Sequence, residues 1–285
     1  MKSKIACIVL NYNDYVTTAE LINKIRDYSV LDYIIIVDNK STDDSLARLS
    51  LLENNNIIVV SSDKNGGYGY GNNIGLKYAI DVLKCQYCLI ANPDVIFEEK
   101  IVPRMISFLK ENDEYGVVSP YQKGTKKQAW KKVNFIKDQL FYSLILNKIF
   151  NPRYYSDDYF NNIECDVYAV KGCFVMFKSE AIKSIDYYDE DFFLFEEEKV
   201  IALKLENKGY KSAVLTDIDY IHNHSVSIKK TFFRLGQRKR LVLNSNELYL
   251  RKYMGIKGVK MFFVKIYHFY CYLESIVYDF VLALK

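Results

Sequence analysis

The 285-residue sequence predicts an α/β fold in which a mostly parallel sheet is flanked by helices. Two observations support this fold class. Half of the residues are hydrophobic, which is enough for a large core. In addition, the first 120 residues alternate short, continuous apolar runs with segments of helical pattern. Alternation of strand and helix implies right-handed crossover connections, and such connections produce a parallel sheet.

Four apolar runs are expected to form neighbouring strands. They are rich in β-branched and aliphatic residues, as is typical of parallel strands that are covered on both faces. The expected strands are residues 4–10, 33–38, 56–60 and 87–92, and the expected helices between them are residues 14–28, 43–53 and 71–84. Ligands of such sheets bind at the carboxyl ends of strands, so the residues that follow each run are the candidates for a binding site.

The second half of the chain follows a different pattern. Polar segments at 121–132 and 151–162 surround a short helix, and strands are expected to resume at 165–170 and 173–178. A helix is then expected to begin near Glu197. The α/β alternation therefore describes the first half better than the second.

Charge is unevenly distributed along the chain. Residues 229–285 carry twelve Lys and Arg against three acidic residues, whereas the rest of the chain carries 27 against 32. This basic, aromatic region is expected to be helical, and two interpretations stay open. In the first interpretation the region packs against the body of the protein. In the second, residues 256–285 form an interfacial helix pair on an anionic membrane. Lys265 and Glu274 leave too short an uncharged stretch to span a bilayer.

Composition also bears on compartment and partners. The six cysteines are scattered and lie mostly in apolar runs, as reduced core cysteines do. Cys85 and Cys88 form a lone C-x-x-C motif, and without a second pair a zinc or redox site is disfavoured. The N-terminus lacks the pattern of a signal peptide, so we expect a cytoplasmic protein. The acidic body, without any recognised nucleic-acid motif, argues against a nucleic-acid partner.

Asp38 ends the second expected strand. A carboxylate in that position is costly unless a donor bonds to it. The N3–H of a nucleobase is one such donor and a backbone amide is another, and the residues alone do not decide between them. Ser41, Thr42 and Asp43 are expected to cap the next helix.

Two further strand ends carry possible ligand-binding residues. Residues 66–75 contain five glycines, which permit positive φ angles and close approach of a ligand to the backbone. A plain glycine-rich turn is the alternative, because a dinucleotide fingerprint would follow the first strand. Asn92 and Asp94 occupy alternate positions beyond the fourth strand, so both side chains can reach one site. A cation bound to a diphosphate needs few protein ligands, although an Asn-Pro-Asp turn also explains these residues.

Three consecutive carboxylates, Glu196, Glu197 and Glu198, stand at the start of an expected helix. The helix dipole favours acidic residues at its first turn, which accounts for Glu196. If the helix begins near Glu197, Glu198 shares a face with the apolar residues three, four and seven positions further on. We therefore expect Glu198 to be half-buried, with the raised pKa that suits a general base.

Together these motifs resemble the family 2 glycosyltransferases, inverting enzymes with the GT-A fold, and in particular the rhamnosyltransferase-like branch of bacterial surface polysaccharide synthesis. The resemblance runs from about Ile5 to His224 and rests on IVLNYND, VDNKSTD, NGGYGYGNNIG, NPDV, KGCFVMF, FFLFEEE and IHNHSVS. It implies a Rossmann-like GT-A catalytic domain, residues 1–228, with a nucleotide-binding half (1–120) and an acceptor-binding half (121–228). The helical C-terminal region, 229–285, follows as an appendage.

The resemblance also implies roles for individual residues. The nucleotide-binding residues would be Asn11, Asp38, Asn65, Gly67, Asn72 and Asn92, with Asp38 on the base. Asp94 would bind a Mg²⁺ or Mn²⁺ ion, and Asn92 stands where the family often has Asp. His222, which is followed five residues later by a serine, would also reach the metal or the diphosphate, and His224 is its rival. Basic residues further along, beginning with Lys229, could neutralise phosphate.

The catalytic base is assigned from the same resemblance. The family segment commonly reads Glu-Asp with a second Asp two residues further on, and the matching residues here are Glu197, Glu198 and Val200. Glutamate in place of aspartate keeps the chemistry but extends its reach by one methylene. We assign Glu198 as the base and keep Glu197 as the alternative.

The expected function is transfer of a sugar, with inversion, from a UDP- or dTDP-sugar to a lipid-linked acceptor saccharide. The setting would be capsule, O-antigen or exopolysaccharide synthesis at the inner face of the cell membrane. The altered Glu-Asp segment keeps a second class open, a non-catalytic subunit that binds sugar nucleotides or saccharides. A third class, the sugar-phosphate nucleotidyltransferases, would need a glycine-rich basic loop after the first strand. The sequence does not name the sugar, and uracil and thymine share the N3–H that Asp38 would read.

Overall fold

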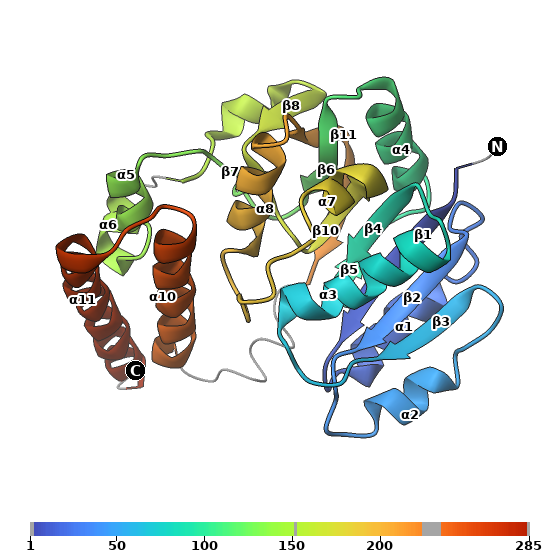
Figure 1. The fold of residues 1–285 in the computed structure, drawn as a ribbon, viewed down its shortest axis with the longest axis horizontal. Helices are drawn as coiled ribbons and strands as arrows, with labels where there is room; N and C mark the ends of the chain where they lie inside the picture. Colours follow the sequence, from blue (N-terminus) through green and yellow to red (C-terminus); the bar gives the residue numbers. More distant parts are fainter. Residues whose placement is uncertain (1–2, 151–152, 224–234, 284–285) are drawn as a thin grey trace.

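The computed structural model of the protein describes residues 3–150, 153–223 and 235–283, and its fold is drawn in Figure 1. Over these residues, nine strands form one mixed sheet in the order β3-β2-β1-β4-β10-β6-β11-β5, with β8 paired to β11. The strands of this sheet are β1 (Ile5–Asn11), β2 (Tyr33–Asp38), β3 (Ile57–Ser61), β4 (Tyr87–Ala91), β5 (Val95–Ile96), β6 (Tyr115–Gln122), β8 (Glu164–Val167), β10 (Phe174–Lys178) and β11 (Lys211–His222). A small second sheet pairs β7 (Ala129–Trp130) with β9 (Ala169–Val170).

Helices cover both faces of the large sheet and also form a group beside it (Figure 1). The helices are α1 (Tyr15–Ile25), α2 (Ser45–Ser50), α3 (Tyr68–Lys77), α4 (Ile101–Glu111), α5 (Phe135–Leu140), α6 (Leu144–Phe150), α7 (Ser179–Ser184), α8 (Glu197–Glu206), α10 (Leu235–Lys252) and α11 (Gly258–Ala283). A π-helical turn, Tyr78–Val82, continues α3, and a 3₁₀ turn, Asp157–Asn161, precedes β8. The predicted α/β class with flanking helices is confirmed.

The first four strands lie where the apolar runs predicted them. β1 pairs in parallel with β2 and with β4, and β2 pairs in parallel with β3. The residues of β1 from Ile5 to Val9 are all buried, because one core cluster covers each face of the sheet. The helix expected at 71–84 begins earlier, at Tyr68, since the glycine-rich segment itself is helical from that residue.

The second half of the sheet departs from the parallel pattern. β10 lies between β4 and β6 and runs antiparallel to both. An antiparallel neighbour brings its amino end to the carboxyl end of the adjacent strand, and here Phe174 pairs with Ala91. The residues just before β10 therefore meet the residues just after β4. β11 then returns parallel to β6.

The C-terminal region is helical, as predicted, and lies at the side of the molecule away from β1–β3 (Figure 1). α10 and α11 pack together and contact the body through two small apolar clusters. One cluster joins Phe192 and Val200 to Tyr249, and the other joins Tyr142 to Leu243 and Cys271. The packing interpretation of the tail is thus correct for one face of each helix. The interfacial interpretation concerns the opposite face of these helices.

The cysteines behave as predicted from their apolar surroundings. Each of the six is a free thiol, and five of them are buried. Burial raises the pKa of Cys85 to about 11 and that of Cys88 to about 12. The C-x-x-C pair therefore belongs to the core beneath β4.

Gly75 provides a test of the packing of α3 on the sheet. A Cβ atom added there would lie 2.5 Å from Ile8 Cγ2 and 3.1 Å from Val37 Cγ2. We predict that Gly75→Ala lowers the free energy of unfolding, because an overpacking cost of about 1–3 kcal/mol exceeds the gain in helix propensity of about 1 kcal/mol. The measurement is the urea midpoint followed by circular dichroism.

A matched control is Gly236→Ala in α10, where an added Cβ would meet its nearest atom at 3.6 Å, an ordinary contact. Its urea midpoint should stay the same or rise. A midpoint for Gly75→Ala at or above that of the control would contradict the packing described here.

Candidate active site

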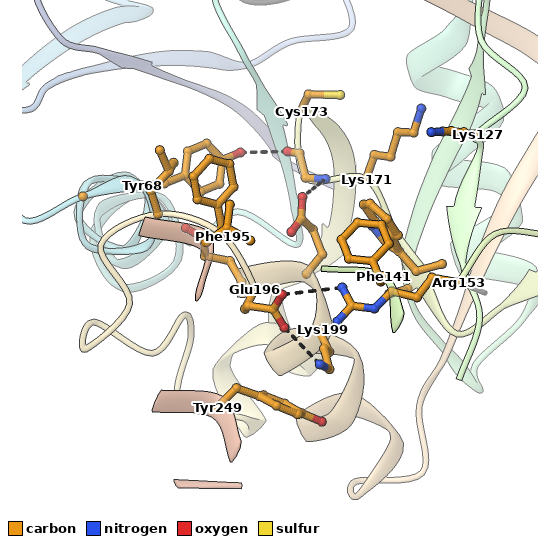
Figure 2. A pocket seen from close by; sticks show the side chains of 18 of the residues that line it. Tyr68, Lys127, Phe141, Arg153, Lys171, Cys173, Phe195, Glu196, Lys199 and Tyr249 are labelled. Carbon is orange, nitrogen blue, oxygen red and sulfur yellow. Dashed lines mark hydrogen bonds and ion pairs between the residues drawn. The ribbon is translucent and has the colours of Figure 1, made fainter. Parts of the chain in front are cut away.

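A cavity of about 1070 Å³ opens at the carboxyl ends of the strands. Figure 2 shows part of its lining. The predicted site residues that line this cavity are Asn65, Gly67, Asn92, Asp94, Glu197, Glu198 and His222. Asn11, Asp38 and Asn72 are buried side chains outside the lining. The structure thus places most of the predicted residues in the lining of one cavity, and the other three are buried outside that lining.

Asp38 is held by donors from the protein itself. Its Oδ1 accepts a hydrogen bond from the Ser41 amide at 2.9 Å. Its Oδ2 accepts from Ser41 Oγ at 2.6 Å and from Asn11 Nδ2 at 2.9 Å. Asp38 is only 1% exposed. The Ser41 amide is the backbone donor that the sequence left open as one of two possibilities. Direct contact of Asp38 with a nucleobase stays a prediction.

The expected cap of the next helix needs a correction. α2 begins at Ser45, and Asp43 Oδ1 accepts a hydrogen bond from the Ser45 amide at 3.0 Å. Ser41 instead bonds to Asp38, and the Thr42 amide donates to Asn13 Oδ1. Ser41 and Thr42 therefore fasten the loop after β2 to the loop after β1.

The glycine-rich segment joins two walls of the cavity. Gly67 has a φ of 92°, and an added Cβ would lie 2.1 Å from the carbonyl oxygen of Phe193, so only glycine fits there. That carbonyl also accepts a hydrogen bond from the Tyr68 amide at 2.9 Å. Asn39 Nδ2 donates to Asn65 Oδ1 and to the Gly67 carbonyl, at 3.1 and 3.0 Å. The segment is thus fixed to the loop that precedes the three glutamates.

Asn72 has a structural position within α3. It is fully buried, and its Nδ2 donates to the Tyr68 carbonyl at 3.0 Å. Its Oδ1 has no hydrogen-bond partner among the residues that the structure describes. Its predicted contact with a nucleotide stays untested, and its position outside the lining favours a role in packing.

Asp94 and His222 lie together at one end of the cavity. Asp94 Oδ1 and His222 Nε2 are 3.0 Å apart, because β5 and β11 pair with His222 opposite Val95. Burial lowers the pKa of His222, but hydrogen bonds to Asp94 and Cys173 outweigh it and raise the pKa to about 10. His224, Ser227, Lys229, Lys230 and Arg234 lie outside the described residues, so the choice between His222 and His224 is unchanged.

The donor set at this end fits a cation that is shared with a ligand. Within residues 3–150, 153–223 and 235–283, no three His, Cys, Asp or Glu side chains cluster in the manner of a complete metal site. Asp94 offers a carboxylate, and His222 offers an imidazole nitrogen once a cation displaces the proton that it shares with Asp94. Mg²⁺ and Mn²⁺ commonly complete such a partial set with phosphate oxygens and water.

The predicted helix start at Glu197 is confirmed, and it follows a strained turn. Phe195 and Glu196 both have positive φ angles, 75° and 73°, a conformation that is uncommon for residues with side chains. After this turn, Glu198 is half-buried, and the next apolar positions of its face, Ile201 and Leu205, are 5% and 0% exposed. The inward-facing orientation that the helical spacing predicted is therefore observed.

Glu197 and Glu198 both line the cavity but differ in their hydrogen bonds and exposure. Glu198 Oε1 accepts a hydrogen bond from the Gly172 amide at 3.3 Å, and burial raises the pKa of this carboxyl. Glu197 is 5% exposed, and its Oε1 has no partner in the described part of the chain. Burial, together with the charge of Glu198, raises the pKa of Glu197 well above its ordinary value. Of the two, Glu198 is the carboxylate that accepts a hydrogen bond from the segment before β10.

Gly172 connects the two ends of the site. Tyr68 Oη donates to the Gly172 carbonyl at 2.7 Å and lies 3.3 Å from Asn92 Oδ1. The Asn92 amide in turn donates to the carbonyl of Cys173 at 2.8 Å. The segment before β10 therefore contacts Glu198 with one peptide group and the Asn92–Asp94 loop with the next. Sequence reasoning missed Tyr68, because nothing in the local pattern shows where its hydroxyl points.

Glu196 belongs to a buried ion-pair network that the helix-dipole interpretation did not predict. Tyr142 Oη donates to Glu196 Oε1 at 2.6 Å, and Lys199 Nζ lies 3.0 Å from Glu196 Oε2. Burial alone would raise the pKa of Glu196, but Lys199 and Arg153 lower it to about 2. Figure 2 shows these cations beside Glu196.

The same two cations also bind Asp138. Arg153 Nη2 and Lys199 Nζ each lie 2.7 Å from an Asp138 oxygen. One buried and one half-buried cation are thus balanced by two buried carboxylates, Asp138 and Glu196, which lie 58 positions apart in the sequence. Only the Glu196–Lys199 spacing of three positions offered a sequence signal for this network.

The chain matches a known domain family and a curated protein. Residues 6–186 match the domain family described as Glycosyl transferase family 2. A curated relative, the low-salt glycan biosynthesis hexosyltransferase Agl10 of Haloferax volcanii, is 27% identical over 120 residues. That match covers 42% of this chain and 37% of the relative's length.

Two solved structures share the fold. The S. aureus TarS 1–349 structure, in complex with UDP-GlcNAc, has a TM-score of 0.60 and 18% identity, over 87% of this chain and 67% of the TarS chain. The mannosyltransferase PcManGT from Pyrobaculum calidifontis, in complex with GDP-Man and Mn²⁺, has a TM-score of 0.59 and 14% identity, over 96% of this chain and 70% of that one. The predicted GT-A architecture is therefore confirmed. Since the family match extends over more than half of the chain, the protein belongs to glycosyltransferase family 2.

Proposed function

We propose that this protein transfers a sugar, with inversion, from a UDP- or dTDP-sugar to a hydroxyl of an acceptor saccharide. The observation that carries the proposal is the position of Glu198. It lines the same cavity as Asp94, and Gly172 and Tyr68 link it to the Asn92–Asp94 loop. Inverting transfer requires a base and a diphosphate-binding loop that line the same cavity.

The reaction follows from this arrangement. Glu198 takes the proton of the acceptor hydroxyl while that oxygen attacks C1 of the donor sugar. The bond between C1 and the diphosphate oxygen breaks on the opposite face, and the nucleoside diphosphate leaves with the electron pair. A general base contributes about 10²- to 10⁴-fold to such a step. The raised pKa of Glu198 makes it a stronger base than an exposed carboxylate, and Glu197 remains the alternative base or a group that orients the acceptor.

The charge of the departing diphosphate needs compensation. Asp94 and His222 would hold a Mg²⁺ or Mn²⁺ ion at this end of the cavity, and the ion would neutralise charge on the diphosphate. Asn65, Gly67 and Asn92 line the cavity on the same side and would contact the nucleotide. We assign residues 1–120 to donor binding, 121–228 to acceptor binding and 229–285 to the appendage, and place the enzyme in the rhamnosyltransferase-like branch that builds capsule, O-antigen or exopolysaccharide.

The C-terminal helix supports a membrane-bound acceptor. One stripe of α11 packs on the body through Met261, Val264 and Cys271, and its opposite face is apolar yet exposed. The large exposed side chains of that face are Val259, Phe262, Phe263, Ile266, Phe269, Tyr270, Leu273, Ile276, Val277, Phe280 and Val281. Neighbouring α6 adds Ile145, Ile149 and Phe150. A surface of this size is uncommon on a protein that lies wholly in water.

We propose that this α6–α11 surface lies on an anionic bilayer, at the inner face of the cell membrane. Charge complementarity supports that occupant, because Lys257, Lys260 and Lys265 are exposed along the same segment. Among the described helices, none is both long and apolar enough to cross a membrane. An interfacial position brings the cavity to the surface where a lipid-linked acceptor would lie.

The base assignment is tested by Glu198→Gln, because glutamine cannot take the proton. We predict a fall of about 10²- to 10⁴-fold in the release of nucleoside diphosphate from a panel of sugar nucleotides with Mn²⁺. Glu206→Gln, at the far end of the same helix, is the control and should keep wild-type release. If Glu197→Gln loses activity while Glu198→Gln keeps it, the two roles are reversed. Binding without release would instead favour a non-catalytic subunit, and pyrophosphate chemistry a nucleotidyltransferase.

The donor site is tested by thermal shift with UDP, dTDP and GDP. UDP or dTDP at a hundredfold excess over its dissociation constant should stabilise the protein by about 2.7 kcal/mol, and EDTA should remove part of this effect. Asp94→Asn should lose the Mn²⁺-dependent part, whereas Asp157→Asn, an exposed acidic residue paired with Lys126, should keep it. A shift with GDP alone, or one that EDTA leaves unchanged in the wild type, would contradict the assignment.

The membrane surface is tested by sedimentation with phosphatidylglycerol vesicles. Replacing Phe262, Phe269 and Val277 by serine should reduce vesicle binding at least tenfold, because these side chains supply apolar area on the exposed face. Leu51→Ser, at an exposed apolar residue on α2's end, is the control. Undiminished binding by the triple variant would contradict the proposal. A different outcome is that the wild type binds no vesicles but forms dimers in size-exclusion chromatography, and that the triple variant forms none. This outcome would show that a second copy covers the face.

A further inference from the structure

Three lysines that line the cavity, Lys127, Lys131 and Lys171, have no carboxylate partner among the described residues. Lys127 and Lys171 both line it, and in Figure 2 the Lys171 side chain extends toward Lys127. Neither forms an ion pair with a carboxylate among the described residues. Lys171 Nζ donates to Gln122 Oε1 at 2.6 Å, and Lys127 Nζ lies 4.8 Å from the centre of the Tyr154 ring. Both contacts leave the positive charge of the lysine in place.

The two ammonium groups act on each other. Burial lowers the pKa of Lys171 to about 8, the charge of Lys127 acts in the same direction, and Cys173 and Glu198 oppose it. At neutral pH Lys171 is therefore still protonated; it is half-buried, whereas Lys127 is exposed. Glu198 offsets part of the positive charge of Lys171, and an anionic ligand would offset more of the charge that the two lysines share. Other lysines nearby are neutralised by partners: Lys132 pairs with Glu206 at 2.6 Å, and Lys126 with Asp157 at 2.7 Å.

The loop that carries Lys127 is built to hold its position. The Gln122 amide donates to Gln128 Oε1 at 2.8 Å, and Gln128 Nε2 donates back to the Gln122 carbonyl at 2.9 Å. Gln128 Nε2 also donates to the Thr125 carbonyl at 2.6 Å. Gln128 is 4% exposed, so this clamp is internal. The end of β6, which also positions Lys171 through Gln122, and the Lys127 loop are thus one unit.

Aromatic side chains accompany the lysines. Trp130 and Tyr154 line the cavity with their ring centres 4.7 Å apart. Trp130 Nε1 is a buried donor without an acceptor in the described residues. A wall that offers ammonium groups beside flat aromatic rings fits a ligand with a sugar face and negatively charged oxygens. Trp130 and Tyr154 belong to residues 121–228, which we assign to acceptor binding.

We propose that Lys127 and Lys171 form a subsite for an anionic group, a phosphate or a carboxylate, of the acceptor saccharide, next to the base Glu198. The subsite rests on the proposed transferase function, and it makes acceptor charge a determinant of specificity. Two sources share this chemistry: the diphosphate of a lipid carrier and the carboxylate of an acidic sugar.

Binding to the UDP-saturated full-length protein tests the subsite without requiring turnover. Three probes are compared by thermal shift: N-acetylglucosamine linked to farnesyl diphosphate, the same sugar linked to farnesol without phosphate, and farnesyl glucuronide. The neutral farnesyl probe controls for binding of the chain to the α6–α11 surface. We expect at least one anionic probe to bind at least tenfold more tightly than the neutral one. The probe that does so identifies the source of the charge.

Variants assign the effect to the two lysines. The double change Lys127→Gln and Lys171→Gln should reduce the preference for the anionic probe to about twofold or less. Lys132→Gln removes the same charge from a lysine that is already paired, and it should keep the preference. Equal binding of all three probes by the wild type, or no binding, overturns the proposal. It is also overturned if the double variant loses the shift caused by UDP alone, because the lysines would then bind the donor diphosphate. Failure of donor binding in the wild type would instead refute the transferase function.

Discussion

The hydrogen bonds of the Gly172 peptide groups are the constraint on which the site depends. The Gly172 amide fixes Glu198, and its carbonyl accepts from Tyr68, whose hydroxyl also meets Asn92. These contacts exist because β10 runs antiparallel to β4 and delivers its leading residues to the carboxyl end of that strand. A purely parallel sheet would bring this segment to the opposite edge. One reversed strand thus joins the proposed base to the proposed diphosphate end.

The turn before Glu198 is held from the other side by the buried ion pairs. Glu196 is one anchor of that network, and its positive φ angle is tolerated because Arg153, Lys199 and Tyr142 fix its carboxylate. Removing one member would leave an unpaired buried charge, which typically costs about 3–5 kcal/mol. The network also reaches α10, where Asn246 donates to Tyr142 Oη at 2.6 Å. The C-terminal helices therefore stabilise the active-site turn as well as presenting the α6–α11 surface.

The cavity lining contains two kinds of chemistry. Asp94 and His222, the glutamates, and the two lysines with the aromatic pair all belong to that lining. A donor with a diphosphate would meet a cation held by Asp94 and His222, whereas an acceptor with its own negative charge would meet Lys127 and Lys171. Such separation keeps the two substrates in a defined order around the reacting hydroxyl, which is how positioning contributes to catalysis.

The sequence by itself determined the features that depend on neighbours along the chain: the four buried strands, the start of α8 at Glu197 and the inward face of Glu198. Each follows from local periodicity and from helix or strand geometry. Only the tertiary structure decided that Asp38 accepts hydrogen bonds from Ser41 and Asn11, that Glu196 pairs with Arg153, and that Lys127 and Lys171 line the same cavity. These contacts join residues far apart in the chain, or depend on side-chain direction. They are set by how the strands are ordered in the sheet, which no local pattern encodes.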